Sequence, residues 1–76
     1  MANPTIRVVF DIKPRNGGAK AHHVCILGHP GTIDEARSRA RDRIAEAKSA
    51  DSCVTSAIIE ESNGRGWQPI ANITGV

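Results

Sequence analysis

The chain has 76 residues and a formal net charge of +2, so we expect one small domain spanning residues 1–76. This length leaves little room for a substrate cavity, and two cysteines are too few for a disulfide framework. No apolar run approaches the roughly 20 residues of a membrane span, and the first ten residues do not form a signal peptide. We therefore expect a soluble cytoplasmic protein without a membrane partner.

The first two predicted strands flank the turn sequence RNGGAK (Arg15–Lys20). The segment TIRVVFDIK (Thr5–Lys13) alternates apolar and polar residues, and AHHVCIL (Ala21–Leu27) follows the turn. Asn-Gly between two strand-like runs is the strongest short-range signal of a β-hairpin. These segments therefore predict an antiparallel hairpin.

The register of this hairpin depends on the length of its loop. A three-residue loop aligns Val24 with Phe10, whereas a two-residue loop aligns His23 or Cys25 with Phe10. We expect Val24 and Ile26 to face the core, because they form the better β-branched core pair.

The next segment, PGTIDEA (Pro30–Ala36), predicts the start of a helix. Thr32 is a typical N-cap residue, and Glu35 three positions later completes a capping box. Apolar residues then recur at helical spacing on one side of the predicted helix, which we expect to end near Ala50.

A second hairpin follows, with the turn sequence SNGRGW (Ser62–Trp67) between CVTSAIIEE (Cys53–Glu61) and WQPIANITGV (Trp67–Val76). The order ββαββ predicts an α+β fold with a four-stranded antiparallel sheet and one helix packed on one face. We favour the strand order 2-1-3-4, which needs one right-handed crossover, over a sheet in which strands 2 and 3 pair in parallel.

A single helix covers one sheet face, so the composition of the other face matters. Ile58 and Ile59 should point to opposite faces, and so should Ile70 and Ile73. The uncovered face then carries a partly apolar patch, which is typical of an interface. We expect a homodimer that forms through this open face or through an edge strand.

The stretch ARSRARDRIAEA (Ala36–Ala47) places an arginine at every second position from Arg37 to Arg43. On a helix, alternate residues fall on two flanks of the apolar stripe. One flank carries Arg37, Arg41 and Lys48, and the other carries Arg39 and Arg43. These arginines either cover the sheet edges and pair with nearby acids, or form a basic rim for phosphate or an acidic partner.

The second turn places Arg65 close to Trp67, the single tryptophan of the chain. Arg and Trp are enriched at interface hot spots, but Trp67 is also large enough to be a main core residue. The candidate partner-binding residues are thus Arg37, Arg41, Lys48, Arg65 and Trp67.

Catalytic and metal chemistry have weaker support. His23 and Cys25 share one strand face, and Cys53 lies on another strand, which falls short of the converging ligands of a zinc site. As a nucleophile and base, Cys25 and His23 lie too far apart along a strand and lack a third orienting group. We expect no catalytic residues, no metal and no cofactor.

The layout of RVVFDIKPRNGG, the capped GTIDEARSRA helix and SAIIEESNGRGWQPIANI resembles the small ββαββ proteins of phages and mobile elements, among them some anti-CRISPR inhibitors. The resemblance covers nearly the whole chain. It implies a non-enzymatic inhibitor that binds a protein or nucleoprotein complex, blocks access of nucleic acid or oligomerises. The alternatives are a direct nucleic-acid-binding module that uses the basic rim and a structural assembly protein.

Overall fold

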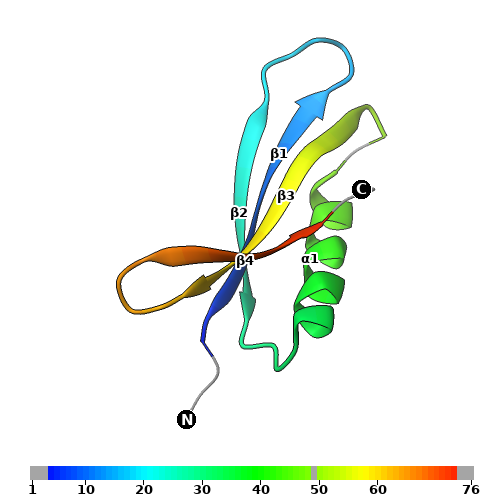
Figure 1. Ribbon diagram of the computed structural model, residues 1–76. Helices are drawn as coiled ribbons and strands as arrows, with labels where there is room; N and C mark the ends of the chain where they lie inside the picture. The colour runs from blue at the N-terminus through cyan, green and yellow to red at the C-terminus, as the bar shows by residue number, and fades with distance from the viewer. Residues whose placement is uncertain (1–3, 49, 74–76) are drawn as a thin grey trace.

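The computed structural model describes residues 4–48 and 50–73 of the chain. It is an α+β domain with one helix packed on an antiparallel sheet, which confirms the predicted class (Figure 1). The elements are β1 (Ile6–Pro14), β2 (Ala21–Gly28), α1 (Ile33–Ala47), β3 (Ser52–Ser62) and β4 (Trp67–Ile73).

The four strands are hydrogen-bonded in the order β2-β1-β3-β4, and every neighbouring pair is antiparallel. Helix α1 packs against β1, β2 and β3 on one face. The hairpin of β3 and β4 extends away from the helix as a twisted arm (Figure 1). The domain is accordingly long and thin, with extents of 46 × 23 × 16 Å.

The core lies between α1 and the covered face of the sheet. Alternate residues of β1 are buried there, with Val8 and Phe10 almost fully excluded from solvent. Ala36 and Ala40 let the helix approach the sheet closely, and Ile44 fills the space beside them. This alternation in β1 and the apolar stripe in α1 are the patterns that predicted both elements.

The predicted register of β2 is wrong. Phe10 lies opposite His23, and the two rings stack with centroids 5.3 Å apart. Val24 and Ile26 consequently point to the uncovered face, where 48% and 54% of their surface is exposed. The physical reason is that the hairpin connection places Ile12 opposite Ala21, which fixes the face of every later residue in β2.

A β-bulge shapes the pattern of β4. The register shifts between Ile59 and Glu60, so Ile70 is an extra residue that packs against the core on the same side as Ile73. The expectation that Ile70 and Ile73 point to opposite faces is therefore wrong, because a bulge reverses the alternation. Ile58 and Ile59 do point to opposite faces, as predicted. The predicted extension of this strand to Val76 lies outside the described residues.

Helix α1 starts as predicted and ends earlier than predicted. Thr32 is the N-cap, and its side chain accepts a hydrogen bond from the backbone N–H of Glu35. The helix ends at Ala47 rather than near Ala50, because Lys48 adopts an extended conformation as the C-cap. Ile44 is the last helical residue buried in the core, so no packing supports a further turn.

Candidate functional site

The uncovered face of the sheet, called the open face below, carries a row of apolar side chains from three strands. Val9 lies directly opposite Val24 on one side and Ile58 on the other, and Ile26 continues the row along β2. Val24, Ile26 and Ile58 rank among the exposed large hydrophobic residues, and Val9 between them is half-buried. We call these residues (Val9, Val24, Ile26 and Ile58) the apolar patch.

One end of the apolar patch is bordered by a cluster of Arg7, Glu60 and Trp67. The Arg7 guanidinium carbon lies 4.1 Å from the centroid of the Trp67 ring, and Arg7 Nε donates a hydrogen bond of 2.8 Å to Glu60 Oε1. A guanidinium over an indole ring is attracted by the π electrons, and its ion pair with a carboxylate fixes its orientation. Trp67 therefore lies on the open face, half-buried by Arg7, and does not fill the core.

The other end of the apolar patch is bordered by Asp11 and His22. These residues lie opposite each other in the register of β1 and β2, and His22 Nδ1 is 2.8 Å from Asp11 Oδ1. The His22 side chain is largely exposed. The open face therefore combines an apolar centre with ionisable pairs at both ends, which is a common layout of an interface.

The arginines of α1 divide into a paired flank and a flank without acidic partners. Arg39 forms an ion pair with Glu35 and donates to the Leu27 carbonyl of β2, and Arg43 pairs with Glu46. On the other flank, Arg37 and Arg41 have no carboxylate within 4.0 Å among the residues that the structure describes.

Arg37 is half-buried, and its Nε is enclosed without a hydrogen-bond partner among the described residues. A buried donor that lacks a partner costs free energy, so an acceptor from a bound molecule could stabilise this guanidinium.

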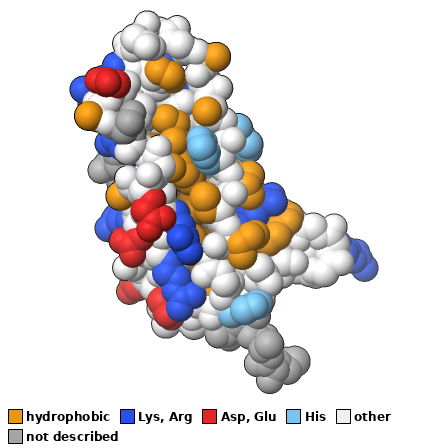
Figure 2. Space-filling model, turned by 180° about the vertical axis from the view of Figure 1, so that it is seen from behind, with side chains coloured by type: hydrophobic (Ala, Val, Ile, Leu, Met, Phe, Trp, Pro, Cys, Tyr) orange, Lys and Arg blue, Asp and Glu red, His pale blue; other side chains and the backbone are white. Residues whose placement is uncertain are grey.

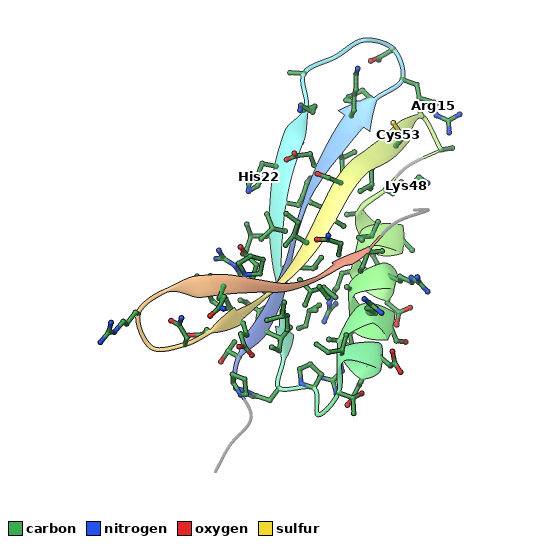
Figure 3. All side chains as sticks on the ribbon, in the orientation of Figure 1. Arg15, His22, Lys48 and Cys53 are labelled. Carbon is green, nitrogen blue, oxygen red and sulfur yellow. The ribbon has the colours of Figure 1, made fainter. Side chains whose placement is uncertain are left out.

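The five predicted site residues do not converge on one surface. Trp67 lies on the open face, and Arg65 is exposed at the tip of the β3–β4 arm. Arg37 and Arg41 belong to the helix on the opposite face. Lys48 follows the end of α1, away from the arm (Figure 3).

Sequence reasoning missed Arg7 and assigned Val24 and Ile26 to the core. Arg7 could have been found from the alternation of apolar and polar residues along β1, because this pattern already places Arg7 on the sheet face opposite to that of Phe10. The contact of Arg7 with Trp67 could not be predicted in the same way, because it depends on how the turn at residues 63–66 sets the pairing of Ser62 with Trp67 and on how β1 pairs with β3.

The described residues do not form a metal-binding site or a reactive cysteine site. Among residues 4–48 and 50–73, no group of three or more His, Cys, Asp or Glu side chains is placed to hold a metal ion. Cys25 and Cys53 are both free, half-buried thiols. Cys53 lies at the start of β3 and is separated from His22 on β2 (Figure 3).

In the described part of the chain, α1 is too short and too polar to cross a bilayer as a helix.

Comparison with known protein families, curated proteins and solved structures finds no match to this chain.

Proposed function

We propose that this chain is a non-enzymatic binding protein that acts through contact of its open face with a protein partner. The observation that carries the proposal is the apolar patch beside the Arg7–Trp67 cluster. Contiguous exposed apolar side chains commonly mark an interaction surface, and Trp and Arg supply much of the binding energy of such surfaces.

The orientation of Trp67 favours a role in binding over that of a surface residue without a function. Arg7 holds one face of the indole ring, and Glu60 holds Arg7, so the ring is already oriented before a partner arrives. An ordered aromatic side chain loses little conformational entropy on binding. The ion pair also balances the charge of the cluster, so that the cluster suits a surface of mixed polarity.

The more specific form of the proposal is an inhibitor of a bacterial defence ribonucleoprotein, as the resemblance to anti-CRISPR proteins implies. The layout of the chain supports this form, and so does the presence of cationic side chains away from the apolar patch. In this form, the open face contacts a protein subunit. Arg37, Arg41 and Lys48 on the helix side, and Arg65 on the arm, then lie near the nucleic acid of the complex.

The test measures binding to purified CRISPR effector complexes and inhibition of their cleavage of target DNA. Ile58→Lys places a charge in the apolar patch at a residue that is already 38% exposed, so the fold should be retained. We expect Ile58→Lys and Trp67→Ala each to weaken binding at least about tenfold, as for hot-spot residues. Ala19→Lys adds the same charge at an exposed residue of the β1–β2 turn, away from the apolar patch and from α1, so it is the matched control and should bind like the wild type.

Two outcomes would contradict the proposal at different levels. If the wild type neither binds nor inhibits any effector complex, the inhibitor assignment fails. If an effector complex is bound equally well by the wild type and by Ile58→Lys, the open face is not the binding surface. Circular dichroism of each variant confirms that the fold is intact.

Direct nucleic-acid binding is the second candidate, and the unpaired flank of α1 favours it. Arg37 and Arg41 lie one helical turn apart without acidic partners among the described residues, so a phosphate backbone could neutralise both.

The salt dependence of binding to RNA and DNA tests this candidate. Replacing Arg37 and Arg41 together by Glu should remove about one unit of the log–log salt slope for each lost phosphate contact. Arg43→Glu, on the paired flank, should leave the slope unchanged. Absence of a mobility shift with the wild type at low salt would exclude this candidate.

A further inference from the structure

We infer that the free edge of β2 pairs with the β2 edge of a second copy of this chain. The first observation is a mismatch between the sequence of β2 and its place in the fold. The segment AHHVCILG has apolar residues on both faces, which is typical of a strand with covered faces and two neighbours. In the structure, β2 is an edge strand in which only Leu27 is fully buried.

The second observation is the contrast between the two edges of the sheet. Edge strands are commonly protected from pairing by proline, bulges or charged side chains. Edge strand β4 contains Pro69 next to a bulge. Edge strand β2 contains no proline, lysine, arginine, aspartate or glutamate. The edge of β2 from Ala21 to Ile26 is therefore the unprotected one.

One end of this edge is already occupied, which limits the segment that can pair. Arg39 Nη1 donates a hydrogen bond of 2.9 Å to the Leu27 carbonyl, and the register shifts between Ile6 and Arg7 at the same point. A bulge with a side-chain cap ends regular pairing there. The pairing segment is thus residues 21–26.

A second copy fits this edge by symmetry and by charge. Identical strands can pair antiparallel about a two-fold axis, so that one uncharged edge serves both copies without like-charge repulsion. The same axis brings the Arg7–Glu60 end of one open face toward the Asp11–His22 end of the other, and each end holds an acidic and a basic side chain in contact, so neither end opposes the pairing by like-charge repulsion.

The surface near the histidines agrees with this arrangement. All three histidines of the chain belong to β2 or to the segment that follows it. Figure 2 shows hydrophobic side chains gathered in a band beside these histidines, between the charged side chains and the projecting arm. The apolar side chains of β2 on the open face, Val24 and Ile26, therefore lie next to the edge that pairs and remain accessible in the dimer.

The resulting dimer has a continuous sheet with both helices on one side and both open faces on the other. A single strand pair with its flanking side chains is a small interface, so we expect a dissociation constant on the order of micromolar. The open faces stay accessible, so this inference does not depend on the proposed partner binding.

Sedimentation equilibrium of the full chain from about 1 µM to about 1 mM tests the stoichiometry. Hydrogen exchange of backbone amides, followed by NMR at the two ends of this range, tests the edge. We expect reversible dimer formation and slower exchange of outward-facing amides within residues 21–26 at high concentration. We expect Val24→Lys to weaken the dimer at least about tenfold and Ile58→Lys, on an interior strand, to leave it nearly unchanged.

Two other outcomes of these measurements would overturn the inference. A monomer at every concentration excludes the dimer. A dimer in which the amides of β2 show no added protection, and which Ile58→Lys disrupts as strongly as Val24→Lys, forms through the open face instead of the edge. Both substituted residues are exposed in the monomer, and circular dichroism verifies that each variant folds.

Discussion

Glu35 links the first turn of α1 to the loop that precedes it. Its Oε2 accepts a hydrogen bond of 3.0 Å from the Gly31 backbone N–H, and its Oε1 lies 2.7 Å from Arg39 Nη2. The Gly31 hydrogen bond, followed by the charge of Arg39, lowers the pKa of Glu35 below its ordinary value of 4.5. Both contacts favour the ionised carboxylate, so folding and ionisation of Glu35 are coupled.

We expect this coupling to appear as a pH-dependent effect of Glu35→Gln. Since the folded state lowers the pKa, the stabilisation is fully present above pH 4.5 and is lost as the pH falls through the folded pKa. The wild type should therefore be more stable than Glu35→Gln at neutral pH, and this difference should shrink in acid. Urea unfolding of both proteins, followed by circular dichroism across this range, measures it. A difference that is the same at every pH would contradict the coupling.

At the scale of whole elements, the contact between Arg7 and Trp67 joins the β3–β4 arm to β1. Arg7 belongs to β1, whereas Trp67 is the first residue of β4. Glu60 of β3 orients Arg7 from the strand between them. The cluster therefore spans three neighbouring strands at the point where the arm leaves the helix-covered part of the sheet.

We expect Arg7→Met to free the Trp67 ring while it keeps the unbranched stem of the side chain. The emission of Trp67, the sole tryptophan, should shift to longer wavelength and become more sensitive to acrylamide quenching. The loss of stability should be about 1 kcal/mol or less, as for other exposed cation–π contacts. Glu60→Gln removes the ion pair and keeps the ring contact, so it should change the emission less. Identical spectra for Arg7→Met and the wild type would show that the stacked arrangement is not populated in solution.

Local sequence patterns predicted the elements well and predicted one strand register wrongly. The Thr32 cap, the alternation of β1 and the two Asn-Gly turns depend on neighbouring residues, so the sequence displays them directly. The face of Val24 depends on where the hairpin connection sets the register. In an apolar strand such as β2, either face looks suitable for the core, so composition could not decide.

At the scale of the whole molecule, residue spacing predicted an apolar patch on the uncovered side of the sheet but could not predict which side chains share that side. Arg65 and Trp67 are neighbours of the same turn in sequence, yet one is exposed at the tip and the other lies under Arg7 on the open face. The cluster with Arg7 depends on strand pairing across much of the chain. The candidate residues that were selected by residue type therefore lie on separate surfaces. The fold instead brings Trp67 together with Arg7 and Glu60, which the sequence had not indicated.

The thin shape would allow the two proposed contacts to form on one chain at the same time. Only one sheet face is covered by α1, and the strand edge and the open face are different surfaces of the same sheet. Pairing at the edge widens the open face without covering it. A partner that spans both copies would then gain avidity, because two sites are held at a fixed separation.

The projecting arm offers a practical site for attachment. Residues 63–66 at its tip are exposed, and their backbone belongs to neither the helix packing nor the core. Exposed hairpin tips of this kind commonly tolerate inserted sequence. Gly64 has a φ of +85°, which a side chain would strain, so the exposed Arg65 is the better position for an affinity tag or a fluorescent label. A tag of graded size there would show how closely a bound complex approaches the arm.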